Sequence, residues 1–220
     1  MPYRRQCGEP TKLRPRQRYE AKVLPDCRAG KGTTMTAGIN PKRSVALLEK
    51  RLDETTNERH RAILSAVLKH VALETESVWD VDQIMATLTP NPAYHIWVNG
   101  VDKGPKGADA VRAFYTETVR NRTNFLEFDV ERLVVDDNCA IVEGFLKHIY
   151  PGSHAARMGM AVDDPDADYL VVFRTLVVLP VDEEGLIKGE DFYRSGPASV
   201  TKLSRDELPQ EYVTLRRASG

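Results

Sequence analysis

Apolar residues recur three or four positions apart in three successive segments of the chain, at about residues 42–52, 57–75 and 80–88. Positions with this spacing share one side of a helix, so each segment is predicted to be an amphipathic helix with one buried face. The sequence TPNP at 89–92 predicts the end of the third helix, because proline lacks the amide hydrogen that a helix needs and clashes with the preceding turn.

After residue 92 the pattern changes to an alternation of apolar and polar residues, which predicts strands. One strand is expected first, then a helix that starts near Gly107, then four more strands. Those four strands are predicted over residues 125–131, 140–149, 170–181 and 187–194. The third of them is apolar on both faces and is therefore expected at the centre of a sheet. A short edge strand is expected over 200–203, and the charged tail after Ser204 is expected to fray.

This order of elements is typical of a curved sheet wrapped around a pocket, and a pocket lined by Tyr, His, Asp and Arg is where chemistry is expected. The chain has 220 residues, which fits a single domain. We assign that domain to residues 35–205, between a basic N-terminal arm at 1–34 and a charged C-terminal tail at 206–220.

The N-terminal arm differs from the rest of the chain in its charge. It carries nine Lys or Arg residues against three Asp or Glu residues, whereas the whole chain has a net charge of −1. Apolar residues are sparse and unpatterned in the arm, which predicts a disordered tail. Contact with nucleic acid or with a neighbouring subunit is the alternative. For the whole chain, the near-neutral charge argues against nucleic-acid binding.

Two further observations bear on the compartment. No apolar run approaches the roughly 20 residues that span a bilayer, and the N-terminus lacks the apolar stretch of a signal peptide. The three cysteines, Cys7, Cys27 and Cys139, are scattered and form no CxxC motif, which indicates neither a disulfide framework nor a zinc site. The expected location is therefore a reducing cytoplasm, with no membrane partner.

Two short patterns carry a resemblance to a known family. The helix after the first predicted strand reads G-x-x-A-V-R-x-F-Y over 107–115, and the last turn reads E-G-x-I over 184–187 before a strand that ends in Tyr193. With their order and spacing, these residues make the chain, over about 75–200, resemble the nuclear transport factor 2-like (NTF2-like) superfamily, in particular its SnoaL-like bacterial branch. The resemblance implies an α+β fold, in which a cone-shaped, curved mixed sheet packs on N-terminal helices. It implies no single activity, because this fold hosts isomerases, cyclases, dehydratases, epoxide hydrolases and binding modules.

The last predicted strand offers candidate catalytic residues. Alternation places Ile187, Asp191 and Tyr193 on one face, and if Ile187 packs inward the other two point into the cone. Desolvation raises the pKa of a carboxylate in an apolar cavity, which suits a general base, and a tyrosine hydroxyl stabilises developing oxygen charge. The alternative is that Asp191 pairs with an arginine such as Arg174 for structure alone.

Two more candidates for catalysis lie on other strands. Arg174 interrupts an otherwise apolar strand, where an unpaired guanidinium is costly. It is expected either to pair with Asp191, Glu143 or Glu127 or to orient a substrate oxygen. An ordinary histidine changes its charge near neutral pH, so His95 is a second candidate for the base, with a satisfied core or rim histidine as the alternative.

Four residues are candidates for substrate binding, namely Tyr94, Trp97, Tyr115 and His148. Tyr94 is also a candidate for stabilising oxygen charge. For Tyr115 the alternative is a plain core position, because its spacing is that of a buried helix face. The segment 151–168 is expected to be either a lid over the cavity or a disordered surface loop.

No metal and no cofactor are expected. The sequence has no HxH, HExxH or carboxylate triad, and the acidic residues at 163–168 lack the glycine and the distal glutamate of a calcium loop. The GKG at 30–32 lies in the basic arm rather than between a strand and a helix, so it does not indicate a phosphate-binding loop.

We therefore predict a cofactor-independent lyase or isomerase that applies general acid–base catalysis to a small hydrophobic, aromatic or polycyclic substrate. Asp191 or His95 is the expected base, and Tyr193, Tyr94 or Arg174 is expected to stabilise oxygen charge. The resemblance adds a specific alternative, a lyase of the kind that deformylates lignin-derived diarylpropanes in aromatic compound catabolism. The remaining candidate functions are a hydratase or dehydratase and a non-catalytic binding or assembly module.

One structural observation separates the enzyme from the module. A wholly apolar inward face favours the module, whereas two or more titratable groups within hydrogen-bond reach of one another favour the enzyme. A homodimer or homotrimer is also expected, because the strand at 170–181 is apolar on both faces and one of them needs a cover.

Overall fold

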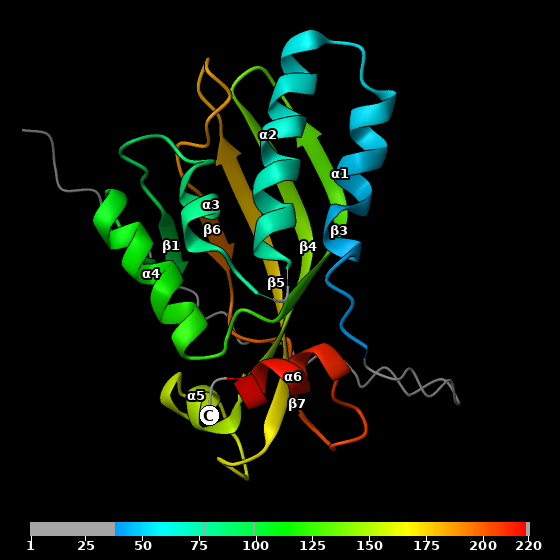
Figure 1. Cartoon of the computed structure of the whole chain (residues 1–220), viewed down its shortest axis with the longest axis vertical. Coiled ribbons are helices and arrows are strands. Elements are labelled where there is room, and N and C mark those ends of the chain that lie inside the picture. The colour runs from blue at the N-terminus through cyan, green and yellow to red at the C-terminus, as the bar shows by residue number, and fades with distance from the viewer. Residues whose placement is uncertain (1–37, 77, 99, 219–220) are drawn as a thin grey trace, which may run out of the picture. The chain divides into compact units, whose positions relative to one another are not determined.

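The computed structural model describes residues 38–218 except 77 and 99, so the arm predicted at 1–34 lies outside the described residues. The described residues form six helices and a seven-stranded mixed sheet (Figure 1). This is the α+β architecture, with helices first and an open curved sheet after them, that the sequence predicts.

The three predicted N-terminal helices are present as α1 (Arg43–Glu54), α2 (Glu58–Glu74) and α3 (Val81–Met85). The side chain of Asn57 caps α2 by accepting a hydrogen bond of 2.9 Å from the backbone N–H of His60. Such a cap satisfies one of the amide groups that the first turn of a helix leaves without a partner. The third helix is shorter than predicted, because the residues after Met85 leave it to reach the sheet edge.

The sheet has the strand order β2-β1-β6-β5-β4-β3, and β7 pairs with β5. Its strands are β1 (His95–Val98), β2 (Val101–Asp102), β3 (Leu126–Val135), β4 (Cys139–Pro151), β5 (Asp168–Pro180), β6 (Asp191–Arg194) and β7 (Ser199–Leu203). The pair β1–β6 is parallel and the others are antiparallel. The apolar strand that the sequence places at the centre is β5, which pairs with β4 along its whole length and with β7 and β6 along its two halves.

The main core lies between the helices and one face of the sheet. In Figure 1, α1 and α2 lie across β3, β4 and β5, and α4 (Ala108–Arg120) lies beside β1. The core side chains include Leu48, Ile63, Leu64, Val67, Val142 and Val177, all of them buried. Burying each such side chain stabilises the fold by about 1.5–3 kcal/mol, so this layer fixes the position of the site described below.

The chain after Ser204 does not fray as predicted. It forms α6 (Gln210–Ala218), in which Tyr212 is only 1% exposed. The Tyr212 hydroxyl donates a 2.8 Å hydrogen bond to Asp168, and its ring packs on Phe125. The prediction was wrong because it weighed the charge of the tail and not its single buried aromatic residue, which anchors the helix.

The segment after β4 is also ordered, so the disordered-loop alternative for 151–168 is wrong. It begins with α5 (Gly152–Arg157), and Ala155 of this helix is buried against Tyr150, Tyr169 and Phe173. These contacts hold α5 against the ends of β4 and β5. The placement brings side chains of the segment to the cavity described below.

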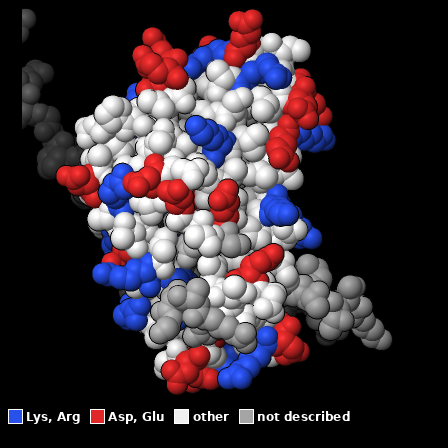
Figure 2. Space-filling model, in the orientation of Figure 1, with Lys and Arg blue, Asp and Glu red and all other residues white. Residues whose placement is uncertain are grey.

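The surface carries both signs of charge. On the face shown in Figure 2, Lys and Arg residues lie interspersed with Asp and Glu residues. Among the described residues, no helix is both long enough and apolar enough to cross a membrane.

Candidate active site

A cavity of about 380 Å³ lies between the helices and the inner face of the sheet. Its walls are largely apolar and include Phe128, Val142, Leu146, Val177, Leu179 and Phe192. The volume lies at the low end of the range for small-molecule sites, and apolar walls with a few polar groups are the usual lining of such sites. Polar side chains enter this cavity in two clusters, one acidic and one basic.

The acidic cluster centres on His70 of α2, which is fully buried. Its Nδ1 lies 2.6 Å from Oγ1 of Thr87, and that hydroxyl donates to the backbone carbonyl of Ile84 at 2.6 Å. A hydroxyl has one hydrogen to donate, so His70 Nδ1 must carry the hydrogen of the first contact. The tautomer of His70 is fixed in this way.

The other ring nitrogen of His70 shares a proton with a carboxyl group. His70 Nε2 lies 2.9 Å from Oε1 of Glu190, which is also buried. With Nδ1 already protonated, this contact needs one more proton, carried either by the imidazole or by the carboxyl group. Burial would lower the pKa of His70, but the charges of Glu74 and Glu190 and the Glu190 hydrogen bond outweigh it and raise that pKa.

Glu74 completes the acidic cluster at the cavity wall. Its Oε1 lies 3.5 Å from His70 Nε2 and accepts a hydrogen bond of 2.6 Å from the hydroxyl of Tyr115. Because the Tyr115 hydrogen is used there, the Tyr94 hydroxyl donates to Tyr115 at 2.6 Å. The side chain of Glu74 is 19% exposed, against 0% for His70 and 3% for Glu190. Glu74 is therefore the member of this trio most open to a ligand.

The surroundings of Glu74 bring its pKa close to neutral pH. Burial, followed by the charge of Glu190, raises the pKa of Glu74 to about 7, and His70 and the Tyr115 hydrogen bond oppose the rise. Burial also raises the pKa values of Tyr94 and Tyr115 well above the usual value, so both hydroxyls stay protonated. A carboxyl group with a pKa near 7 beside neutral donors is the arrangement that general acid–base catalysis needs.

The basic cluster consists of His148, Tyr150, His154 and Arg194. Burial, followed by the charges of Arg194 and His154, lowers the pKa of His148 to about 3, so its ring is neutral. That ring stacks on Tyr150 at 4.8 Å, and His154 packs edge-on against Tyr150 at 5.0 Å. Burial raises the pKa of Tyr150 to about 12, and the charge and hydrogen bond of Arg194 oppose the rise.

Three residues predicted from the sequence line this cavity, namely Tyr94, Tyr115 and His148. The structure brings Tyr94 and Tyr115 into direct contact at the acidic cluster and places His148 in the basic one. Their roles in binding remain predictions.

The predicted inward placement of Asp191 and Tyr193 is wrong. The side chains that line the cavity are Glu190, Phe192 and Arg194, whereas Tyr193 is 47% exposed and borders a shallow hollow elsewhere. The alternation from Ile187 breaks at Gly189, whose φ of +145° suits glycine and whose α-carbon faces the backbone of Ala93 so closely that a Cβ would collide with it. Counting by twos across this glycine assigns every later side chain to the wrong face.

The remaining predicted residues lie outside the cavity lining. His95, Trp97 and Tyr193 form a row of stacked rings, with centroids 6.2 and 6.5 Å apart. His95 Nδ1 lies 2.7 Å from Oδ2 of Asp102. His95 and Asp191 are neighbours in the parallel pairing of β1 with β6. Their catalytic roles remain predictions, but the geometry puts them away from this cavity.

Of the two roles expected for Arg174, the structure shows pairing with carboxylates. Its guanidinium donates to Glu131 and Glu143, each at 2.6 Å, and lies 4.8 Å from the centre of the Phe145 ring. Glu143 is one of the three partners that the sequence suggested. Of the other two, Glu127 accepts instead from Lys147 at 2.9 Å.

Sequence reasoning missed His70, Glu74 and Glu190. A signal for the first two is present, because Ile63, Val67, His70 and Glu74 follow one another at helical spacing on the buried face of α2. A histidine and a glutamate inside an apolar stripe are costly unless they are used, and they therefore mark a candidate site. For Glu190 the signal was hidden by the break at Gly189.

Two groups among the described residues have the composition of a metal site. The donor atoms of His70, Glu74 and Glu190 lie within 4.8 Å of one another, and one nitrogen with two carboxylate oxygens suits a divalent cation. The internal hydrogen bonds of the trio are also complete without an ion, since Thr87 and Tyr115 supply the outer partners.

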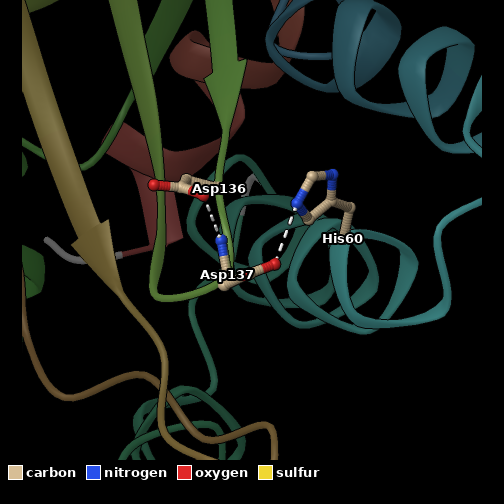
Figure 3. A group of neighbouring side chains, drawn as sticks. All are labelled: His60, Asp136 and Asp137. Atoms are coloured by element: carbon tan, nitrogen blue, oxygen red, sulfur yellow. Dashed lines mark hydrogen bonds and ion pairs between the residues drawn. The ribbon is translucent and has the colours of Figure 1, made fainter.

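The second group, His60, Asp136 and Asp137, lies at the surface (Figure 3). His60 Nε2 lies 3.1 Å from Oδ1 of Asp137, whose backbone N–H donates to Oδ1 of Asp136. Arg59 next to His60 donates to the backbone carbonyl of Asp137 at 2.8 Å. These contacts hold the start of α2 against the β3–β4 turn, which accounts for the group structurally.

Comparisons with solved structures bear on the fold. A putative SnoaL-like polyketide cyclase from Shewanella putrefaciens CN-32 aligns with a TM-score of 0.51 at 11% identity, over 75% of this chain and 92% of that chain. An NTF2-like protein from Anabaena variabilis ATCC 29413 aligns with a TM-score of 0.47 at 10% identity, over 64% and 92% of the two chains. A ketosteroid isomerase-like protein from Erwinia carotovora atroseptica SCRI1043 gives 0.42 at 14% identity, over 66% and 99%.

No protein-family model matches the sequence, and no curated protein matches it. At identities this low, structural likeness establishes the fold and not the activity. The described part of the chain has the α+β fold of the SnoaL-like structure from Shewanella putrefaciens CN-32, as the resemblance in the sequence implies.

Proposed function

We propose that this protein is a cofactor-independent isomerase or lyase that moves a proton on a small hydrophobic substrate held in the cavity. The observation that carries the proposal is the contact of Glu74, which has a pKa of about 7, with the buried His70–Glu190 pair. A hydrogen-bonded pair of titratable groups, His70 and Glu190, with Glu74 3.5 Å from His70 at the cavity wall, favours an enzyme over a binding module.

Glu74 is the proposed base. Its carboxylate is the most exposed of the trio, and protonating it relieves the repulsion from Glu190 that raises its pKa. In an isomerisation the proton then returns to a different atom of the substrate. In a lyase reaction a C–C bond of the substrate breaks, its electron pair stays on the carbon of the leaving fragment, and that carbon takes the proton from Glu74. No redox step or group transfer is involved, so the proton balance closes within Glu74 and the substrate.

His70 and Glu190 hold the proton beside Glu74. Their shared proton keeps a partial positive charge near Oε1 of Glu74, which favours its ionised form in the resting site. Tyr94 and Tyr115 supply protonated hydroxyls next to the same carboxylate. When Glu74 accepts a proton, these hydroxyls become available to an oxygen of the substrate that gains negative charge.

The experiment is a screen for carbon-acid exchange. Aromatic and steroid-like ketones are incubated with the protein in D₂O containing EDTA and no cofactor, and proton NMR follows the loss of the α-hydrogen signal. We expect catalysed exchange for at least one ketone, lost in Glu74→Gln and kept in Asp191→Asn. Exchange that needs an added metal, or that persists in Glu74→Gln, contradicts the proposal.

No described residue selects among the more specific reactions predicted from the sequence. Diarylpropane cleavage, hydration and dehydration each require an acid–base group at an apolar cavity, and the acidic cluster would serve any of them. The homodimer or homotrimer expected from the sequence stays a prediction, checked by light scattering at micromolar concentration.

A further inference from the structure

The basic cluster of the cavity contains a cation with no acidic partner. Arg194 ends β6 and lines the cavity, and among the described residues no carboxylate lies within ion-pair distance of it. Its guanidinium instead forms a hydrogen bond with Tyr150 and lies 4.8 Å from the centre of the Phe173 ring. The adjacent Arg174 shows the usual solution, since it pairs with two glutamates. A half-buried guanidinium without a counter-ion favours an anionic ligand.

A buried nitrogen atom without a hydrogen-bond partner faces the same part of the cavity. Nδ1 of His154 is buried and has no hydrogen-bond partner among the described residues. Its side chain lines the cavity from α5, next to Met158. Buried polar atoms without a partner are uncommon in folded proteins, and one that borders a cavity indicates a group on a ligand.

The spacing from Glu190, just before β6, to Arg194 at its end gives the ligand a length and a direction. Glu190 and Arg194 both line the cavity and lie four residues apart in extended chain, which corresponds to roughly 13 Å between their α-carbons. Phe192 lies between them on the same face. An anionic group is repelled by Glu74 and Glu190 and attracted by Arg194, so a ligand with one such group has one favoured orientation.

We propose that the cavity binds a hydrophobic monocarboxylate, with its carboxylate on the guanidinium of Arg194 and the side chain of His154, and its ring system along Phe192 toward Glu74. A planar carboxylate fits the two parallel donors of a guanidinium. The proposal rests on the proposed function for the identity of the reactive end. It adds the chemical class of the substrate and a residue that determines specificity.

The test compares each carboxylate with its neutral amide of nearly the same shape. Isothermal titration calorimetry measures the affinities of benzoate, 2-naphthoate and 4-biphenylcarboxylate and of the three matching carboxamides. We expect at least one carboxylate to bind the wild-type protein about tenfold or more tightly than its amide, as a charge-assisted pair of hydrogen bonds allows. Failure of all three carboxylates to bind more tightly than their amides overturns the proposal.

Two variants then locate the preference. Arg194→Gln is expected to bring the carboxylate-to-amide ratio close to one, whereas Arg174→Gln, which removes a neighbouring cation with acidic partners, is expected to keep it. An unchanged ratio in Arg194→Gln overturns the proposal. If that variant does not fold, the wild-type protein is used, and NOEs are measured between a labelled Met158 methyl group and the ring hydrogens next to the carboxylate of the bound probe. A bound probe that shows no such NOE overturns the proposal.

The exchange assay and the binding assay test the proposed function and the carboxylate site separately. In Glu74→Gln the binding preference is expected to persist, because the carboxylate lies at the other end of the cavity. In the wild-type protein, a carboxylate preference without exchange on any ketone contradicts the proposed function alone. Exchange in the wild-type protein without a carboxylate preference contradicts the carboxylate site alone.

Discussion

Two histidine–carboxylate pairs in this protein have similar distances and different surroundings. His70 Nε2 lies 2.9 Å from Glu190, and His95 Nδ1 lies 2.7 Å from Asp102. Asp102 also accepts hydrogen bonds from the backbone N–H groups of Ile96 and Gly104 and from Lys106, and these hold its pKa far below the usual value. Its charge is compensated, so its proton affinity is low.

The buried pair lacks that compensation. His70 and Glu190 lie against a second carboxyl group, Glu74, and burial raises the pKa of that group to about 7. A short contact between a histidine and a carboxylate therefore does not mark a reactive site by itself. What differs is whether other donors neutralise the carboxylate or whether burial and a like charge keep it ready to take a proton.

The largest expected effect comes from changing one residue at each of the two sites, Glu74 beside the buried pair and His95 in the compensated pair. Once a substrate is known, Glu74→Gln removes the proposed base and is expected to lower turnover by roughly 10²–10⁴-fold, with folding intact. His95→Gln breaks the compensated pair and is expected to change turnover by no more than about twofold, as for a residue that does not touch the reacting atoms. Steady-state kinetics with circular dichroism as the folding control measures both. A collapse in His95→Gln with normal turnover in Glu74→Gln would restore His95 as the base, as the sequence suggests.

The second effect concerns the glycine that directs Glu190 into the cavity. Gly189→Ala places a Cβ against the Ala93 backbone at a φ that favours glycine, and is expected to lower the free energy of unfolding by at least about 3 kcal/mol. Gly185→Ala is the matched control, because it has a φ of +83° and no neighbour within 4 Å, and should cost about 1 kcal/mol. Urea unfolding curves measure the difference. Equal losses in the two variants would mean that the close approach at Gly189 is not constraining.

Gly189 and Glu190 also show which parts of the structure could be predicted from the sequence. The elements and the NTF2-like resemblance follow from periodicity and two motifs, because packing an amphipathic helix or strand requires that pattern along the chain. The site required more, since the faces of the last strand depend on one glycine whose φ is not readable from spacing. Glu74 and His70 were visible as polar residues in an apolar stripe, but Glu190 lies 120 positions from His70, and Tyr115 lies 41 positions from Glu74.

The third effect is on the pH profile. Glu74 acts as a base only when ionised, so with its pKa at about 7 the value of kcat/KM should rise about tenfold per pH unit below pH 7 and level off above it. A stopped-flow or NMR rate profile between pH 5 and 9 checks this. A profile that is flat over this range would contradict a base with a pKa near neutrality.

The smallest effect sharpens the assignment within the cluster. The Tyr115 hydroxyl donates to Glu74 and lowers its pKa, so Tyr115→Phe is expected to raise the pKa of Glu74 and move the midpoint of the rate profile to higher pH. Tyr193→Phe removes an exposed hydroxyl outside the cavity and should leave the midpoint unchanged. A shift to lower pH in Tyr115→Phe would show that this hydrogen bond favours the neutral carboxyl group.

The central claim is that Glu74 exchanges its proton near neutral pH because burial and Glu190 raise its pKa. Carbon-13 NMR of glutamate side-chain carboxyl groups over pH 3 to 9 tests it most directly, with Glu74→Gln assigning the signal. The expected result is one carboxyl resonance with a midpoint near pH 7 in the wild-type protein that is missing from the variant. If every glutamate carboxyl group titrates below about pH 5, as unperturbed glutamates do, the acidic cluster does not hold a base suited to neutral pH and the claim is contradicted.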